Sequence, residues 1–371
     1  MSFYHKYEKL KQIPFSAKFH EVTSMQVESA LTKDMLTTAD YFALLSPAAE
    51  SYLEDMARLA HQKTVQHFGW TMQLFLPLYV SDYCVNTCKY CSFSVDNVFP
   101  RRRLTLSEVE KEAKAITEMG IEHVLLLSGE SRIHSSISYL KEIMTVLSKY
   151  FSSVGIEIQP LDTTEYEELV ESGIDGLTVY QEVYDEEVYR ELHTKGPKRN
   201  YRYRLDTPER GCKAGMRSVN IGALLGLDDW RKESFIAGLH ADYLQTKYLE
   251  TEIGVSFPRM RPHAGSYQPK TDVTDKNLVQ AMLALRLFIP RAGITLSTRE
   301  SEFLRNQLIP LGVTKMSAAS STEVGGYSEP DNTQSQFEIS DDRSVAAIRK
   351  LLYSKGYQPV MKDWQIIGAE D

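Results

Sequence analysis

The sequence predicts a (β/α)8 barrel of the TIM type, with a helical extension at its N-terminal end and a helix and tail at its C-terminal end. Two observations favour this fold class. Eight apolar stretches with strand character alternate with helical patterns, and a length of 371 residues suits one α/β barrel. We divide the chain into a helical extension at 1–68, a barrel at 69–330 and an extension packed on the barrel at 331–371.

Helical spacing dominates the first segment. Val27, Ala30 and Leu31 are spaced to share one buried face, and Ser46-Pro47 is a start signal for the next helix. No strand pattern precedes residue 71, so we expect this segment to be a helical extension that precedes the barrel.

The alternation begins with an apolar strand at 71–80. Ser107-Glu-Val-Glu110 has the form of a capping box, and Gly120 ends the helix that it starts. The later predicted strands are 121–127, 154–159, 175–181, 218–224, 252–257, 293–298 and 313–318. The later predicted helices are 137–150, 163–172, 185–194, 200–214, 231–248, 274–288, 301–308 and, beyond the barrel, 342–354.

Composition and charge exclude several classes of protein. Hydrophobic residues at 42% and charged residues at 25% are typical of a folded globular enzyme. The net charge of -8 argues against a nucleic-acid binder, whose affinity comes from a positive surface. Arg101-Arg-Arg103 is the only compact basic run, either a solvated loop or a local contact to an anionic cofactor.

The sequence also predicts a location. No run approaches the ~20 apolar residues that cross a bilayer, and the first residues lack the apolar core of a signal peptide. We therefore expect a cytoplasmic protein without membrane contact. Only four cysteines occur, so a disulfide framework is not expected. Cys212 stands apart from the other three and is interpreted as a plain thiol.

Three cysteines form the most informative motif. Cys84, Cys88 and Cys91 have the spacing C-x3-C-x2-C and directly follow the first predicted strand, at the barrel end where active sites lie. Structural zinc is the competing interpretation, but closed zinc sites need four ligands and no second Cys/His pair follows. Three thiolates on a four-iron cluster would leave one iron open to a small molecule.

This motif resembles that of the radical S-adenosylmethionine (SAM) superfamily. The resemblance implies one [4Fe-4S] cluster, SAM and an external one-electron reductant. Leu127-Ser-Gly-Glu130 resembles the segment that receives the methionyl amine, although Ser128 stands where a glycine is common. Gly222-Ala-Leu-Leu-Gly226 resembles the segment near adenine, with Leu224 in place of isoleucine and Asp229 at a position that is usually Glu. The implied SAM contacts are Tyr90, Ser128, Gly129, Glu130, Gly222 and Leu224.

Longer segments resemble one branch, the 2-iminoacetate synthases, which are tyrosine lyases of thiamine thiazole biosynthesis. These segments include Glu157-Ile-Gln-Pro-Leu161, Val179-Tyr-Gln-Glu182, Val255-Ser-Phe-Pro-Arg259, Leu296-Ser-Thr-Arg-Glu300 and Gly325-Gly-Tyr327. The resemblance implies cleavage of the Cα–Cβ bond of L-tyrosine, giving 2-iminoacetate (dehydroglycine) and 4-cresol, with 5′-deoxyadenosine and methionine formed from SAM. It also implies a partner, thiazole synthase (ThiG), which receives the labile product.

Two relatives must be distinguished from this branch. The tyrosine lyase that matures the [FeFe]-hydrogenase cofactor carries a further C-terminal cysteine motif, whereas this chain has no cysteine after Cys212. The tryptophan lyase of thiopeptide biosynthesis also has a single cluster, so it remains an alternative. A zinc-stabilised binding protein without turnover is the alternative from another class.

Several polar residues at predicted strand ends are candidates for binding. A guanidinium suits a carboxylate, so Arg299, assisted by Ser297 or Thr298, is our candidate for the substrate carboxylate; an ion pair with Glu300 is the alternative. Tyr83 is a candidate by its proximity to the cysteines. Strand-end residues that could bind the ribose or methionyl group of SAM, or simply pack at the barrel mouth, are Gln159, Gln181 and Glu182. No catalytic residue is assigned beyond the cluster.

Overall fold

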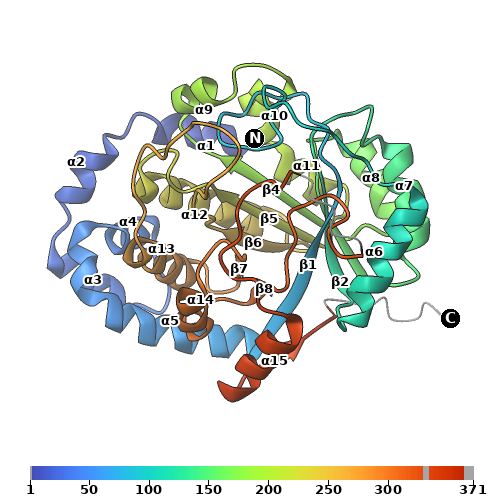
Figure 1. The fold of residues 1–371 in the computed structure, drawn as a ribbon. Helices are drawn as coiled ribbons and strands as arrows, with labels where there is room; N and C mark the ends of the chain where they lie inside the picture. The colour runs from blue at the N-terminus through green and yellow to red at the C-terminus, as the bar shows by residue number, and fades with distance from the viewer. Residues whose placement is uncertain (1, 329–333, 363–371) are drawn as a thin grey trace.

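The computed structural model describes residues 2–328 and 334–362, and they form a closed barrel of eight parallel strands surrounded by helices (Figure 1). Parallel pairing of β1 with both β8 and β2 closes the barrel. The predicted fold class and all eight predicted strands are confirmed. The strands are β1 (Thr71–Ser81), β2 (His123–Ser128), β3 (Ser153–Glu157), β4 (Gly176–Glu182), β5 (Ser218–Ala223), β6 (Glu252–Ser256), β7 (Gly293–Leu296) and β8 (Lys315–Ser317).

Helices follow the strands as the sequence predicts, with two corrections. The capping box of α6 is formed by Thr105 and Glu108, because the Thr105 hydroxyl accepts from the Glu108 N–H; the box predicted at Ser107 was wrong. The helix predicted at 200–214 is two helices, and Pro208 lies in the first turn of the second. The helices are α6 (Leu106–Glu118), α7 (Ile137–Leu147), α8 (Thr163–Glu171), α9 (Glu186–Leu192), α10 (Tyr201–Leu205), α11 (Thr207–Lys213), α12 (Trp230–Lys247), α13 (Asp275–Phe288) and α14 (Glu302–Leu308).

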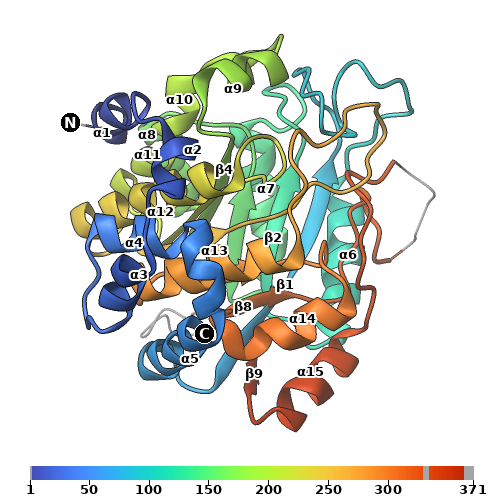
Figure 2. The same cartoon turned by 90° about the vertical axis from the view of Figure 1, so that its left-hand side faces the viewer.

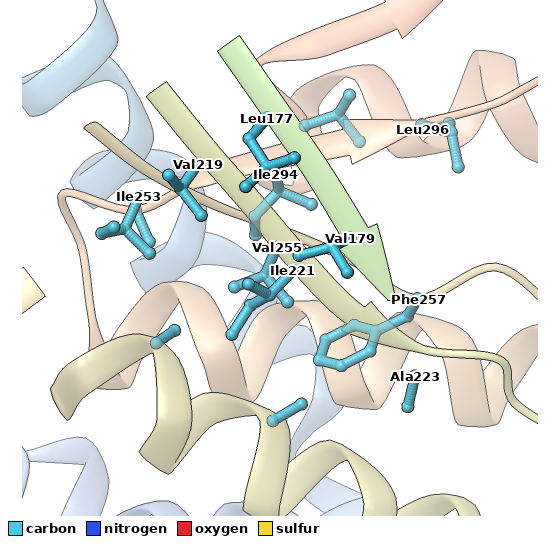
Figure 3. Close-up of a cluster of buried hydrophobic side chains, with 14 of the residues drawn as sticks. Leu177, Val179, Val219, Ile221, Ala223, Ile253, Val255, Phe257, Ile294 and Leu296 are labelled. Carbon is cyan, nitrogen blue, oxygen red and sulfur yellow. The ribbon is translucent and has the colours of Figure 1, made fainter. Parts of the chain in front are cut away.

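The two faces of the barrel strands differ sharply. The outward residues of β4 to β7 are branched and buried; Leu177, Val219 and Ile253 are paired neighbours on this face (Figure 3). One residue further along, the inward face carries Thr178, which pairs in register with Asn220, Gly254 and Gly293 in turn. TIM barrels normally fill this interior with bulky side chains. Here the Asn220 side chain fills the space beside Gly254, and Thr178 lines a cavity that extends toward the C-terminal ends of the strands.

N-terminal helices cover one flank of the barrel (Figure 2). Helices α4 and α5 contact α13, and α1 contacts α12. The Tyr41 ring stacks on Phe288 of α13 with 4.5 Å between the ring centroids, and its hydroxyl donates to the Ser234 carbonyl. The helices are α1 (Phe3–Leu10), α2 (Phe15–His20), α3 (Ser24–Leu31), α4 (Thr38–Leu44) and α5 (Leu53–Phe68), with a 3-10 helix at Pro47–Tyr52.

The chain after β8 returns to the barrel. Helix α15 (Val345–Ser354) precedes a short strand, β9 (Gln358–Val360), which pairs in parallel with the first residues of β1. The sequence did not predict this strand, because three residues with a central proline carry no strand pattern. Residues 331–333 and 363–371 of the predicted C-terminal extension lie outside the described residues.

Glu233, in the first turn of α12, is a buried carboxyl whose titration should affect stability. Its Oε2 accepts the Tyr184 N–H at 2.6 Å. Burial raises the pKa of Glu233 to about 8 from its ordinary value of 4.5, against the opposing charge of Lys232. Because the folded state then binds this proton more tightly than the unfolded chain, the free energy of unfolding should fall as the pH rises between these two values.

Glu233→Gln should weaken this pH dependence, because the amide oxygen can still accept the Tyr184 N–H but cannot ionise. Thermal unfolding midpoints of both proteins, measured between about pH 6 and about pH 8, test this. We expect the midpoint of the variant to fall less with pH than that of the wild type. Parallel curves would show that Glu233 does not titrate in this range.

Candidate functional site

The cysteine loop lies at the C-terminal end of the barrel strands, between β1 and α6. Cys84, Cys88 and Cys91 all line one cavity that enters the barrel. The loops that follow β1 and β6 gather beyond this same end of the strands (Figure 2). The position expected from the barrel topology is therefore the one that the structure shows.

Arg101 holds the cysteine loop in shape. One of its terminal nitrogens donates to the carbonyls of Asp82 and Phe93 at 2.7 and 2.8 Å, and the other donates to the Ser94 carbonyl at 2.7 Å. Both interpretations of the basic run, a solvated loop or an anion contact, missed this role. The signal available in the sequence was the position of an arginine directly after a loop rich in small polar residues, whose carbonyls need donors.

A second constraint on the loop is Gly129. Its N–H donates to the Ser81 carbonyl at 2.7 Å. A Cβ at this position would lie 2.4 Å from the carbonyl oxygen of Tyr83. Only glycine allows the backbone after β2 to approach the cysteine loop so closely.

The thiols suit a cluster better than a single ion. In the part of the chain that the structure describes, no group of three or more His, Cys, Asp or Glu side chains is close enough to hold one metal ion. Burial raises the pKa of all three thiols, that of Cys91 to about 11. Iron would have to displace these protons, because the thiolate is the ligand. Three thiols around a cavity fit a cluster of several irons with one side open.

A network of buried charges lies beside the cysteine loop, where the Asn86 side chain donates to Glu130 and accepts from the Lys198 N–H. Arg204 donates to Glu130 at 2.8 Å, and Lys198 donates to Glu182 at 2.8 Å. Longer contacts join Lys198 to Glu130 at 3.8 Å and Arg204 to Glu182 at 3.6 Å. Although burial alone would raise the pKa of Glu182, the charges of Lys198 and Arg204 lower it below its ordinary value. All four side chains line the cavity.

The backbone of Glu182 is strained. Its φ of 72° is one of two positive values among the non-glycine residues that the structure describes, and the pairing of β4 with β5 is irregular between Tyr180 and Glu182. Such conformations cost about 1–3 kcal/mol and persist where surrounding contacts enforce them, most often at functional sites. Here the ion pairs with Lys198 and Arg204 hold the side chain.

Tyr90 lies between the second and third cysteine ligand candidates and lines the cavity. Its hydroxyl forms a hydrogen bond with Nε2 of His193 at 2.6 Å, and the two rings meet edge to face. Segment 193–198 thus fixes the ring against the cysteine loop. The ring packs tightly and also faces the cavity, so both interpretations of Tyr90 remain compatible with its position.

Arg299 lies across the cavity from the charge network and is not paired with an acid. Its guanidinium stacks on the ring of Phe337, 3.4 Å from the ring centroid. Glu300, the alternative partner, pairs with Arg259 instead. Within residues 2–328 and 334–362, Arg299 makes no ion pair. Burial lowers the pKa of its guanidinium. Ser297 and Thr298 line the same part of the cavity.

Residues 334–341, which we call the strap, cross the mouth of the barrel. The Tyr79 hydroxyl donates to Oε1 of Gln336 at 2.7 Å, and Nε2 of Gln336 lies 3.9 Å from Sγ of Cys91. The Ser340 N–H donates to the Thr298 carbonyl at 2.9 Å. Sequence reasoning missed the strap, because nothing in its composition indicates that it returns to the cavity.

Four of the predicted site residues lie outside the cavity lining. Nε2 of Gln159 donates to the Ser135 carbonyl at 2.7 Å, and Tyr83 stacks on His134 with 3.7 Å between ring centroids. Gln181 is buried, and a Cβ at Gly222 would lie 2.0 Å from the Ser256 carbonyl oxygen. The predicted residues that do line the cavity are Cys84, Cys88, Tyr90, Cys91, Ser128, Gly129, Glu130, Glu182, Leu224, Ser297, Thr298 and Arg299.

Comparison with known proteins identifies the family. A model of the Radical SAM superfamily matches residues 78–236, and a model of the Biotin and Thiamin Synthesis associated domain matches residues 256–358. The 2-iminoacetate synthase of Escherichia coli K12 is 43% identical over 343 residues, which are 92% of this chain and 91% of that protein. The chain belongs to the 2-iminoacetate synthase family.

A second relative agrees with this assignment. The 2-iminoacetate synthase of Salmonella typhimurium is 38% identical over 364 residues, 98% of this chain and 97% of that protein. A member of the 2-iminoacetate synthase family within the radical SAM superfamily is a lyase that uses a [4Fe-4S] cluster and SAM. This membership overturns the zinc-stabilised binding protein as an interpretation.

Among solved structures, this chain is similar in fold to HydG, a maturase of the [FeFe]-hydrogenase. One HydG structure superposes with a TM-score of 0.88 at 31% identity, covering 95% of this chain and 80% of that chain. HydG from Carboxydothermus hydrogenoformans gives 0.83 at 34% identity, covering 96% and 82%. Methylornithine synthase shares the fold, with a TM-score of 0.73 at 20% identity.

None of the helices in the described ranges is long and apolar enough to cross a membrane.

Proposed function

We propose that this protein cleaves the Cα–Cβ bond of L-tyrosine, giving 2-iminoacetate and 4-cresol, and that it does so for thiamine thiazole biosynthesis. The observation that carries the proposal is a single cavity lined by Cys84, Cys88 and Cys91 together with an unpaired guanidinium, that of Arg299. Family membership supports the reaction, and the cavity supports an amino acid as the substrate.

Residues in different parts of the cavity have different proposed roles. Cys84, Cys88 and Cys91 would hold the [4Fe-4S] cluster, which together with SAM would supply the radical chemistry of the reaction. The charge network of Glu130, Glu182, Lys198 and Arg204 presents fixed charges to the polar groups of SAM. Deeper in the barrel, Phe75, Pro77 and Leu125 form an apolar wall that suits an aromatic ring. From the strap, Gln336 and Phe337 line the cavity.

Turnover with separate amino acids tests the proposal. The reconstituted, reduced enzyme should form 4-cresol and 5′-deoxyadenosine with tyrosine, and 2-iminoacetate should appear as glyoxylate after hydrolysis. Absence of 4-cresol would defeat the tyrosine assignment. Indole products from tryptophan would favour the tryptophan lyase alternative instead.

Arg299→Lys should raise the concentration of tyrosine required for half-maximal turnover by about tenfold or more. Lysine keeps the charge but cannot bind both oxygens of a carboxylate, and such a lost charge-assisted hydrogen bond costs about 1.5–3 kcal/mol. Iron content should stay unchanged, because Arg299 contacts no thiol. An unchanged tyrosine requirement would remove Arg299 from the substrate site.

Three further features complete the proposal. An external one-electron reductant reduces the cluster. The product is passed to thiazole synthase, since 2-iminoacetate is hydrolysed in water. We also propose a cytoplasmic location, where thiols remain reduced.

A further inference from the structure

Glu157 is a cavity-lining carboxyl that the proposed reaction has not yet used. It ends β3, pairs in register with Leu127 of β2 and lies inside the barrel. The other acids of the cavity wall are each held by a cation: Glu130 by Arg204, Glu182 by Lys198 and Glu300 by Arg259. For Glu157 the described residues provide neither a hydrogen bond nor an ion pair.

Glu157 and Arg299, neither of which forms an ion pair in the described residues, face each other across the cavity. In a closed eight-stranded barrel, β3 and β7 lie on opposite sides, so Glu157 and Arg299 approach the cavity from facing walls. They are close enough to influence one another electrostatically, yet they form no ion pair within 4.0 Å. Each therefore keeps its charge available for a ligand between them.

The surroundings of Glu157 keep its carboxyl able to titrate near neutral pH. Burial and the charge of Glu182 raise its pKa to about 7, while Arg299, Lys198 and Arg204 act in the opposite direction. The phenols of Tyr79 and Tyr180 also face it. An acid with a pKa near the working pH is suited to accept a proton.

The depth of Glu157 selects the part of the substrate that it can reach. Leu127, its partner in register, lies one inward position nearer the mouth than Leu125. The apolar wall of Phe75, Pro77 and Leu125 lies deeper, where the ring fits. The amino and carboxylate groups of an amino acid are two bonds apart, which suits a carboxyl and a guanidinium on facing walls nearer the mouth.

We propose that Glu157 binds the amino group of the substrate and accepts a proton from it, while Arg299 binds the carboxylate. The step moves one proton and no electron: the ammonium becomes a neutral amine and the carboxylate becomes a carboxylic acid. The neutral amine is then the group that loses a hydrogen atom. This inference rests on the proposed function, because it assumes that an α-amino acid occupies the cavity.

The assignment is tested by a thermodynamic cycle in which one change is a substitution at Glu157 and the other is the removal of one group from the ligand. Calorimetry of the anaerobic, unreduced enzyme with cluster and SAM would compare three ligands: tyrosine, 3-(4-hydroxyphenyl)propanoate, which lacks the amine, and phenylalanine, which lacks the hydroxyl. We expect loss of the amine to weaken binding to the wild type at least about tenfold, as for a hydrogen bond between charged groups. In Glu157→Gln the same loss should change affinity less than about threefold.

Outcomes of the cycle separate the possibilities. If Glu157→Gln instead abolishes the difference between tyrosine and phenylalanine, Glu157 binds the hydroxyl and the proposal is overturned. If neither difference changes, Glu157 is not a binding residue. Glu167→Gln, the same substitution on the exposed face of α8, should behave like the wild type in both comparisons.

Turnover as a function of pH gives the second readout. Wild-type kcat/KM should rise as the pH passes about 7, because the carboxylate form of the free enzyme accepts the proton. This rise should disappear in Glu157→Gln and return in Glu157→Asp. If the wild type forms 4-cresol and Glu157→Gln shows the same pH dependence as the wild type, only the proposed role of Glu157 is refuted. A wild type that binds no tyrosine and forms no 4-cresol refutes the proposed function itself.

Discussion

Replacing any one of Cys84, Cys88 and Cys91 with alanine is expected to abolish both stable iron binding and SAM cleavage. The three thiols line one cavity, and each would bind a different iron of one cluster. Loss of a thiol therefore leaves a second iron without a protein ligand. Iron and sulfide analysis after anaerobic reconstitution should give about four irons per chain for the wild type and a small fraction of this for each variant.

Cys212 provides the matched control. It is buried in α11, and it does not line the cavity that the other three thiols share. Cys212→Ala should keep its iron content and its SAM cleavage, apart from a small loss of stability. If a variant at position 84, 88 or 91 retained the full iron content and cleaved SAM, the three-thiol assignment would be wrong.

Arg204→Met should destabilise the fold by about 3 kcal/mol. The arginine is buried and faces two carboxylates, Glu130 and Glu182, and its Nε also donates to the Tyr180 carbonyl at 2.7 Å. Removing one partner leaves buried charge without compensation, which costs ~3–5 kcal/mol in other proteins. The lower end applies because Lys198 still faces both acids.

Urea unfolding of the protein without cofactor measures this change. Arg58→Met is the control, because Arg58 pairs with Asp55 on an exposed face of α5, and such surface pairs contribute ~0–1 kcal/mol. A midpoint for Arg204→Met equal to that of the control would mean that water, rather than Arg204, compensates the two carboxylates.

The sequence was sufficient for the barrel because the relevant patterns are local. Each strand shows its own apolar run, and each helix shows its own period, so the eight units could be read one after another. The cysteine loop could also be recognised from the sequence, because the three candidate ligands lie within eight residues. Placement at strand ends then followed from barrel topology alone.

The remaining parts of the site depend on contacts between distant segments. Lys198 and Arg204 reach Glu182 and Glu130 from segment 197–205, and no sequence pattern pairs these basic residues with the two acids. The strap reaches Tyr79 over more than two hundred residues of chain. Gln159, Gln181 and Tyr83 do not line the cavity. Gln181 alternates with the cavity-lining residues Tyr180 and Glu182 along β4, and Gln159 and Tyr83 lie in loops beyond the ends of β3 and β1.

The outer and inward faces of the barrel strands have separate roles, one in packing and the other in lining the cavity. The branched residues on the outer face carry the packing against the helices (Figure 3), while inward residues such as Thr178, Tyr180 and Ser256 line the cavity. Neighbouring positions on one strand can therefore change independently, one affecting stability and the next affecting the ligand. A lineage of such enzymes could acquire a new aromatic substrate by a few inward substitutions while its outer packing, and hence its fold, stays the same.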